Sequence, residues 1–345
     1  MLRVLHLAAG NRWTGAAAPA FAEVEALRGA GAEAHYAYVG GYKLEAKIGH
    51  LDFTHPLIER AQNPLSFFRT VRALRRFIVE RGIDVVHAHL TYDHALARVA
   101  VRGTKATLAR TFHARRALRS DPYTTWLLAR TRRLFVINET FTKVLSRAVF
   151  TPPPVDLRQF TPEGANVRAA YGIGDDETLI TVIGKLSKDR GFEEALKTFA
   201  LLVTRYSLLA RLMIIGHGEH RPALEALAAE LNVAPIWAGY HETDLAEHYR
   251  ASDLLLFTAR GSDEGHRAVL EAMACGVPVA AYPIDGIHAL LGDPALVASQ
   301  PTPAALAATA RAAIEAGASL RPRVIERSLA FGYGPAAEKL LAGYV

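Results

Sequence analysis

Residues 261–280 read GSDEGHRAVLEAMACGVPVA, and the elements on either side of this stretch decide the fold that the sequence predicts. The apolar run just before it, at residues 254–257, is typical of a buried parallel strand. Apolar residues then recur at helical spacing from Ala268 until Gly276, a residue type at which helices commonly end. A second apolar run begins at Val279. The stretch therefore predicts a strand, a polar turn, a helix and a further strand, which is the repeating unit of a parallel α/β sheet.

The polar turn carries groups that suit a negatively charged ligand. A helix that opens at residues 265–267 directs free backbone N–H groups and the positive end of its dipole into the turn. Arg267 adds a side-chain cation there. Two acids, Asp263 before the helix and Glu271 inside it, can reach different ends of one ligand. The alternative interpretation is an aspartate that caps the helix and a glutamate that is exposed to solvent.

The whole stretch resembles the signature of the retaining nucleotide-sugar glycosyltransferases of family 4, which have the two-domain GT-B fold. Their pattern contains two acids separated by seven residues and ends in Glu-Ala-Met-Ala-x-Gly-x-Pro-Val. Asp263 and Glu271 have that separation; the first acid of the family is usually Glu, and Glu264 is the second candidate for its role. The resemblance implies that Glu271 holds the nucleotide ribose hydroxyls and that Asp263 or Glu264 lies beside the donor sugar. The other donor-binding residues implied in this stretch are Gly265, His266, Arg267 and Ala268.

A second motif lies ahead of the acids, between another predicted strand and helix. Residues 184–191 read GKLSKDRG, a loop flanked by glycines that contains Lys185 and Arg190. Positive charges in a strand-to-helix loop of this kind suit a diphosphate. The motif resembles the family's Gly-Arg-x-x-x-x-Lys-Gly with the two basic residues exchanged. The resemblance implies that Gly184, Lys185 and Arg190 bind the donor diphosphate and that the two charges stabilise it as it leaves.

Two further segments resemble family elements around the donor. Residues 238–249 resemble the turn whose backbone, around Tyr240 and His241, meets the nucleobase. Leu245 would pack near the face of that base. Residues 10–15 resemble the glycine loop between donor and acceptor, which implies a contact with the diphosphate at Gly15. A turn that serves packing alone is the alternative for this loop.

Histidines gather in the first half of the sequence. His113 ends the predicted strand at residues 107–113, at the carboxyl end where open α/β sheets bind ligands. It resembles the family histidine that faces the donor sugar, and a structural role is the alternative. His87 and His89 alternate along another predicted strand, and His94 follows. No carboxylate has the spacing that would support a metal site with these three histidines, so we expect no metal.

The proline-rich segment at residues 151–162, TPPPVDLRQFTP, is the predicted linker between two domains. Strands and helices alternate on both sides of it, which predicts two doubly wound, Rossmann-like α/β domains; in the GT-B fold these face a cleft. The N-terminal, acceptor-side domain is predicted at residues 1–155 and the donor domain at residues 156–329. The resemblance implies that a last helix, at about residues 330–345, crosses back onto the first domain.

Composition and charge limit the class of protein. The chain has 345 residues, of which 50% are hydrophobic, an ordinary globular composition. Its formal net charge is +6, and residues 69–133 contain 15 Lys or Arg against 4 Asp or Glu. This local excess is typical of contact with an anionic membrane surface or a phosphorylated acceptor, or of solvated arginine-rich helices. No motif supports binding of nucleic acid.

One segment of the basic region, residues 64–81, predicts an amphipathic helix. Such a helix can lie on an anionic membrane or pack its apolar face into a domain core. The single cysteine, Cys275, fits a reducing compartment, and no apolar run is long enough to span a membrane. We therefore expect a cytoplasmic protein, with peripheral contact to the inner face of the plasma membrane as a hypothesis.

Together with these residues, the resemblance to family 4 implies a retaining, metal-independent hexosyltransferase. It would move a sugar from a UDP- or GDP-sugar to a glycan or lipid-linked acceptor in cell-envelope polysaccharide or lipopolysaccharide synthesis. The predicted catalytic residues are His113, Asp263, Lys185 and Arg190. No cofactor is expected, because the nucleotide sugar is a substrate and residues 216–221 lack the third glycine of a dinucleotide site. The alternatives are a GT-B-fold nucleotide-sugar epimerase and a non-catalytic scaffold that binds a nucleotide sugar.

Overall fold

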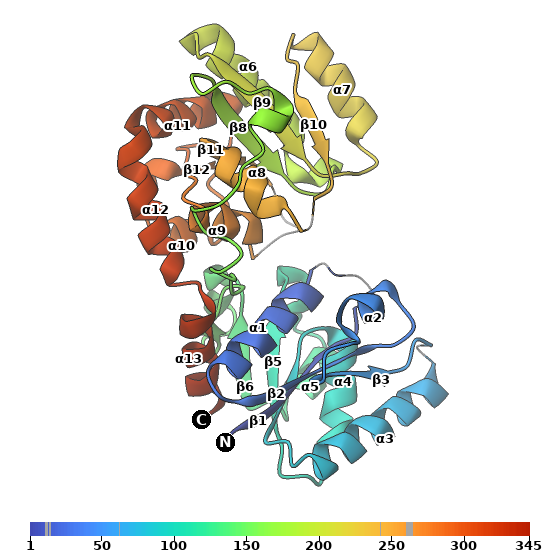
Figure 1. Cartoon of the computed structure of the whole chain (residues 1–345). Coiled ribbons are helices and arrows are strands. Elements are labelled where there is room, and N and C mark those ends of the chain that lie inside the picture. Colours follow the sequence, from blue (N-terminus) through green and yellow to red (C-terminus); the bar gives the residue numbers. More distant parts are fainter. Residues whose placement is uncertain (11–12, 14, 62, 242, 260–264) are drawn as a thin grey trace. The chain divides into compact units, whose positions relative to one another are not determined.

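The computed structural model describes residues 1–10, 13, 15–61, 63–241, 243–259 and 265–345. They form two compact units: unit 1 is Met1–Pro154 with Gly332–Val345, and unit 2 is Val155–Phe331. Each unit has its own parallel sheet with helices between the strands (Figure 1). The predicted fold class, two doubly wound, Rossmann-like α/β domains, is confirmed.

Unit 1 is built on a sheet with strand order β3-β2-β1-β4-β5-β6-β7, in which every pair of neighbours is parallel. Its strands are β1 (Arg3–Ala8), β2 (Glu33–Val39), β3 (Thr54–Ile58), β4 (Val85–Ala88), β5 (Thr107–Phe112), β6 (Arg133–Val136) and β7 (Val149–Phe150). The order reverses between β1 and β4. The carboxyl ends of these two strands therefore lie at the topological switch point, where open sheets bind ligands.

Helices cover both faces of this sheet. They are α1 (Ala17–Gly29), α2 (Lys43–Ile48), α3 (Pro64–Glu80), α4 (Thr91–Ala100), α5 (Pro122–Leu128) and α13 (Tyr333–Tyr344), with 3₁₀ turns at Arg115–Ala117 and Glu139–Lys143. α1 and α13 pack side by side, so the C-terminal helix belongs to unit 1 (Figure 1). Because successive side chains of a strand alternate, Val4 of β1 lies in the core under α1 and α13, and Leu5 in the core under α3 and α4.

The basic helix α3 packs its apolar side into the core of unit 1. Asn63 caps the helix by accepting a hydrogen bond from the backbone N–H of Ser66 at 2.9 Å. Val71, Leu74 and Ile78 are buried against the sheet. The packing agrees with the interpretation as a domain-surface helix.

Unit 2 repeats the arrangement with strand order β10-β9-β8-β11-β12, again parallel throughout. Its strands are β8 (Thr178–Ile183), β9 (Ala210–Ile215), β10 (Ile236–Gly239), β11 (Leu254–Phe257) and β12 (Val279–Ala281). Its helices are α6 (Phe192–Tyr206), α7 (Arg221–Glu230), α8 (Leu245–Ala251), α9 (Arg267–Ala274), α10 (Ile287–Leu291), α11 (Pro303–Ala316) and α12 (Leu320–Leu329). Short 3₁₀ turns lie at Ala169–Tyr171, Lys188–Arg190, Pro294–Leu296 and Gly317–Ser319.

The stretch that predicted this unit forms the expected elements. β11, α9 and β12 follow one another, and α9 ends where Gly276 adopts φ 76°. The backbone N–H of Val277 then bonds back to the carbonyl of Ala272 at 2.9 Å, a common way to end a helix at glycine.

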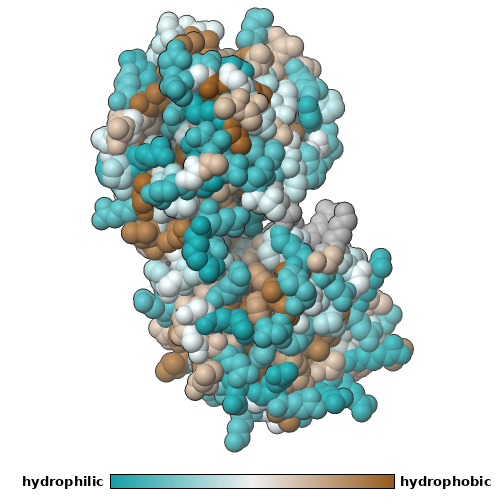
Figure 2. Space-filling view, in the orientation of Figure 1, coloured by the Kyte–Doolittle hydropathy of each residue, from teal (hydrophilic) through white to brown (hydrophobic). Residues whose placement is uncertain are grey.

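The surface of each unit mixes polar and apolar residues. On the face shown in Figure 2, hydrophilic residues cover much of either unit and hydrophobic residues are scattered between them. Within the described ranges, no helix has both the length and the apolar character needed to cross a bilayer.

Candidate functional site

Loops at the carboxyl ends of the unit 2 strands pack against one another through glycines. Gly184 follows β8, and Gly216 and Gly218 follow β9. A Cβ at Gly216 would overlap the carbonyl oxygen of Gly184, and one at Gly218 would overlap that of Leu186. The Gly-x-Gly after β9 is therefore explained by close packing of two loops, without a dinucleotide.

The predicted basic residues lie in the loop after β8. Lys185 is exposed, and its Nζ lies 3.0 Å from Oε1 of Glu219 in the neighbouring loop after β9. Arg190 is half-buried and precedes Gly191, whose carbonyl oxygen accepts a hydrogen bond from the Thr258 hydroxyl after β11 at 2.8 Å. The loop thus lies between the ends of β9 and β11. An exposed ion pair contributes at most about 1 kcal/mol, so Lys185 can exchange Glu219 for a phosphate at small cost.

The residues just before α9 have an uncommon backbone shape. His266 has φ 47°, a left-handed conformation that residues other than glycine seldom adopt. Its Nε2 donates to the carbonyl oxygen of Asp285 at 2.7 Å, and its buried Nδ1 has no hydrogen-bond partner in the described part of the chain. Gly265 is buried and Ala268 is half-buried in the first turn. The predicted turn therefore ends in a helix start that can bind an anion.

Glu271 is fixed on the buried side of α9. Its side chain is 8% exposed; Oε1 lies 3.0 Å from Nε of Arg267, and Oε2 accepts a hydrogen bond from the Tyr249 hydroxyl at 3.1 Å. Burial raises the pKa of Tyr249 well above its ordinary value, and the carboxylate beside it raises that pKa further, so the hydroxyl keeps its proton. Tyr249 lies on α8, and the sequence patterns did not single it out.

The end of β10 provides the segment predicted at the nucleobase. Both ring nitrogens of His241 face oxygen acceptors, Oδ2 of Asp244 at 2.8 Å and the carbonyl of Ala238 at 2.9 Å. Tyr240 is 57% exposed. Leu245 is buried as the first residue of α8. The two contacts of the His241 ring hold the backbone of this turn in place. The exposed ring of Tyr240 precedes it in the sequence.

The remaining predicted residues lie elsewhere. Both candidates for the first acid, Asp263 and Glu264, fall outside the described residues. Gly15 and His113 belong to unit 1. Gly15 has φ 63°, and an added Cβ would meet no atom within 4 Å, so the backbone shape rather than close packing favours glycine here.

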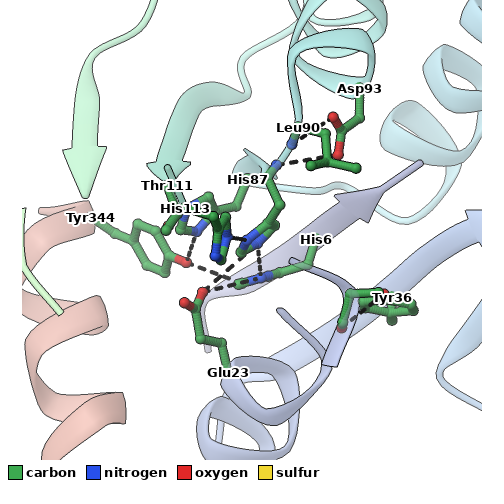
Figure 3. A network of polar contacts seen from close by, with 11 residues as sticks. His6, Glu23, Tyr36, His87, Leu90, Asp93, Thr111, His113 and Tyr344 are labelled. Carbon is green, nitrogen blue, oxygen red and sulfur yellow. Dashed lines mark hydrogen bonds and ion pairs between the residues drawn. The ribbon is translucent and has the colours of Figure 1, made fainter. Parts of the chain in front are cut away.

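His113 is the last ring of a buried hydrogen-bonded chain in unit 1 (Figure 3). Its Nε2 lies 2.8 Å from Nδ1 of His89, and its Nδ1 has no hydrogen-bond partner among the residues described. Burial and, as a smaller cause, the charge of nearby Arg110 lower the pKa of His113 from 6.5 to about 3. The ring is therefore neutral near pH 7 and can offer a hydrogen bond but not a charge.

The chain continues from His89 through four more side chains. Nε2 of His89 lies 2.9 Å from Nδ1 of His6, and Nε2 of His6 lies 3.1 Å from the hydroxyl of Tyr344 on α13. The same hydroxyl lies 2.6 Å from Nδ1 of His87, whose Nε2 reaches the Thr111 hydroxyl at 2.7 Å. The whole row ties β1, β4, β5 and α13 together.

His87, His89 and His94, which are close in the sequence, do not form one group in the structure. His94 bonds Thr131 through Nε2 at 2.8 Å, and His6 and Glu23 instead join His87 and His89. His6 pairs with His87 in the register of β1 and β4, which follows from the strand order and could have been a signal. Glu23 comes from α1, and no spacing in the sequence indicates it.

Comparisons with known proteins agree with the fold and these motifs. Residues 13–157 match the family model described as Glycosyltransferase Family 4, and residues 177–316 match Glycosyl transferases group 1. The chain is 30% identical over 212 residues to a D-inositol 3-phosphate glycosyltransferase of Geodermatophilus obscurus, covering 57% of this chain and 47% of that protein. This chain spans about half the length of the curated relatives it matches.

Solved structures share the architecture over nearly the full length. A glycosyltransferase from Rickettsia africae has a TM-score of 0.84 at 15% identity, covering 99% of this chain and 97% of that one. Anabaena Alr3699/HepE in complex with UDP has a TM-score of 0.84 at 13% identity, covering 99% of each chain; its complex with UDP-glucose also matches. Fold and matched models together define a protein of the GT-B class. The chain belongs to glycosyltransferase family 4.

Proposed function

We propose that the chain is a retaining glycosyltransferase that uses a UDP-sugar donor bound at the strand-end loops of unit 2. The observation that carries the proposal is the state of Glu271. Its carboxylate is nearly buried and is held by Tyr249 at 3.1 Å and Arg267 at 3.0 Å. A carboxylate fixed in this way is a preformed acceptor for the two neighbouring hydroxyls of a ribose.

The positive groups of the same unit suit the diphosphate of the donor. Lys185 and Arg190 lie after β8, and the start of α9 adds its backbone N–H groups and dipole. Departure of a nucleoside diphosphate develops negative charge, which such preorganised groups stabilise. We expect transfer without a metal at this site on that ground.

Two side chains are proposed to contact the donor sugar. Asp263 or Glu264 would lie beside the donor sugar, and the neutral ring of His113 would donate a hydrogen bond to it. The acceptor hydroxyl would attack on the face that the diphosphate leaves, which gives retention. Measurement of the anomeric configuration of the product by NMR tests this step, and an inverted product would contradict it.

UDP is the favoured nucleotide of the donor because the similar protein Alr3699/HepE has been solved with UDP and with UDP-glucose. The proposed acceptor is a phosphorylated or lipid-linked glycan of cell-envelope or lipopolysaccharide synthesis, which the basic segment 69–133 would attract. The name of one relative, a D-inositol 3-phosphate glycosyltransferase, supports a phosphorylated acceptor. Binding of anionic vesicles at low salt tests peripheral membrane contact, and no binding there would contradict it.

Thermal unfolding with UDP, GDP, ADP and inorganic phosphate tests the donor site. A ligand at a hundred times its dissociation constant stabilises the folded chain by about 2.7 kcal/mol, which is an easily measured shift. We expect UDP to protect the wild type most, and Lys185→Ala and Glu271→Ala to lose most of that protection. A wild type that no diphosphate stabilises would contradict the proposal. Release of an altered sugar from a UDP-sugar without acceptor would identify the epimerase instead.

A further inference from the structure

The core of unit 1 contains a carboxylate that faces two histidine nitrogens. Glu23 projects from α1 towards His6 (Figure 3). Its Oε2 lies 3.6 Å from Nδ1 of His6 and 3.8 Å from Nε2 of His89. The two nitrogens are 2.9 Å apart. All three side chains are fully buried. They come from a helix, a strand and the residue after another strand, so the sheet and α1 together hold the three atoms at one place.

Glu23 is the member of this group that the protein's own contacts leave unsatisfied. Neither of its carboxylate oxygens has a hydrogen-bond partner among the described residues. Its distances to the two rings are too long for direct hydrogen bonds. A buried carboxylate without a partner costs several kcal/mol, and such groups in proteins are normally paired or coordinate a metal.

The spacing of the three atoms fits a metal ion. They form a triangle with sides of 2.9, 3.6 and 3.8 Å. A point equidistant from the three corners lies about 2.0 Å from each, which is the distance that zinc keeps from histidine nitrogen and carboxylate oxygen. Two imidazoles and one carboxylate are also a donor set that zinc uses in proteins.

The outer nitrogens of both rings are already occupied. Nε2 of His6 can donate to the Tyr344 hydroxyl at 3.1 Å, and Nδ1 of His89 can donate to Nε2 of His113 at 2.8 Å. Metal-bound histidines almost always donate their second N–H in this way, which fixes the tautomer. His6 Nδ1 and His89 Nε2 are bonded to each other at 2.9 Å, which requires a proton on one of them. With the outer tautomers given above, an ion that replaces this proton would meet a lone pair of each ring beside Glu23.

We propose that His6, Glu23 and His89 bind one divalent transition-metal ion, for which zinc is the best match. His87 lies beside them, with one ligand atom of each of the four within 4.8 Å of the others. Both of its ring nitrogens already bond other groups, Tyr344 at 2.6 Å and Thr111 at 2.7 Å. The protein therefore supplies three ligands, and a water completes a four-coordinate ion.

A second group of potential ligands, in unit 2, lacks these features. His241, Asp244 and His248 also lie close together. Both ring nitrogens of His241 have partners at 2.8 and 2.9 Å, and those of His248 at 3.1 and 3.5 Å. Its carboxylate, Asp244, lies 2.8 Å from Nδ1 of His241 and has a side chain that is 41% exposed, unlike the buried and unpartnered Glu23, so this group carries no metal proposal.

The ion would connect the core of unit 1 to His113. A metal on Nε2 of His89 requires its proton on Nδ1, which then donates to Nε2 of His113. The proton of His113 is thereby held on Nδ1, the atom that has no partner in the described chain. The buried cation Arg110 lies 4.0 Å from Asp93, whose charge offsets it near the site. Only the role of His113 rests on the proposed function; the metal site does not.

Metal content of the full chain tests the proposal. Protein is produced in medium supplemented with zinc or with cobalt and purified without a metal-affinity tag. We expect about one ion per chain by elemental analysis, visible absorption bands in the cobalt form, and X-ray absorption that shows nitrogen and oxygen ligands at about 2.0 Å. Glu23→Gln keeps the shape of the side chain but removes its charge, and we expect it to retain less than about a tenth of the metal.

His94→Gln is the matched control, because His94 is a buried histidine of the same unit that bonds Thr131 instead. It should keep the full metal content. Wild-type protein from both media with less than about a tenth of an ion per chain would overturn the proposal, as would equal metal in wild type and Glu23→Gln. If Glu23→Gln does not fold, the cobalt spectrum and X-ray absorption of the wild type decide the question. Binding of UDP is measured separately, so either proposal can fail alone.

Discussion

The charged groups at the strand ends of unit 2 and the polar groups in the core of unit 1 are held in opposite ways. Lys185 and Glu219 form a single ion pair whose side chains are 58% and 68% exposed. In unit 1, His6, His87 and Tyr344 are buried and joined in one continuous row. An exposed pair can give up its partner to a ligand, because water and the ligand replace the contact. Breaking a hydrogen bond in a buried row leaves a donor or acceptor without a partner.

This difference separates two kinds of polar cluster in one chain. The exposed pair of Lys185 and Glu219 in unit 2 can exchange partners, which is what a substrate that binds and leaves requires. The row in unit 1 is held by hydrogen bonds within the core, whereas Glu23 beside it and Nδ1 of His113 at its end have no partner among the described residues. Our two proposals follow this difference, with a reversible ligand at unit 2 and a resident ion in unit 1.

Removal of the Tyr344 hydroxyl should have the largest effect on stability. Tyr344→Phe leaves the ring nitrogens of His6 and His87 without their partner in the core. We expect a loss of about 3 kcal/mol in the free energy of unfolding, measured by chemical denaturation. Tyr333→Phe is the control, since Tyr333 lies on the same helix and bonds Glu25 in a half-buried position at 2.9 Å. Equal losses of unfolding free energy in the two variants would contradict the claim that the buried row of unit 1 is more costly to disrupt than a half-buried hydrogen bond.

Glu271→Gln should weaken donor binding without unfolding unit 2. The amide oxygen can still accept from Tyr249, whereas the charge that favours the ribose hydroxyls is lost. We expect about 30-fold weaker binding of UDP by calorimetry, which corresponds to about 2 kcal/mol. Glu315→Gln removes a glutamate with the same spacing to an arginine, Arg311 at 2.6 Å on α11, and should leave binding unchanged. Equal affinity of the two variants would remove Glu271 from the site.

Lys185→Ala should weaken binding less, because one of several positive groups is lost. The expected change is about 10-fold in the dissociation constant of UDP, or about 1.4 kcal/mol, with little change in stability. Lys197→Ala, at an exposed position of α6, is the control. A large loss of stability in Lys185→Ala without a loss of affinity would mean that the Glu219 pair is structural rather than exchangeable.

His94→Gln should reduce the dependence of stability on pH. Burial, followed by the charge of Arg110, lowers the pKa of His94 from 6.5 to about 3 in the folded chain. The stability that the neutral ring contributes is therefore present above about pH 6.5 and is lost as pH falls towards 3. Between pH 6 and 5 the variant should lose about 1 kcal/mol less than the wild type in denaturant titrations. Identical pH profiles would show that His94 already titrates normally.

Local patterns predicted the fold well, since strand, turn and helix follow from spacing within a few residues. The strand–turn–helix–strand unit around α9 could be predicted for that reason. Lys185 and Glu271 belong to short sequence motifs, so both could be singled out before the fold was known. Tyr249 and Glu23 could not be found, because each meets its partners only after the chain folds. The contact between His6 and Tyr344 spans 338 positions, and only the pairing of β1 with β4 and the return of α13 create it.

The most direct test of the donor site is hydrogen–deuterium exchange of the full chain with and without saturating UDP. The account predicts the strongest protection at residues 184–191, 238–249 and 265–271 of unit 2, where Lys185, Tyr240 and Glu271 lie. The sheet core of unit 1 should exchange at the same rate in both samples. Protection confined to unit 1, or no protection at saturating UDP, would contradict the assignment of the reversible ligand to unit 2.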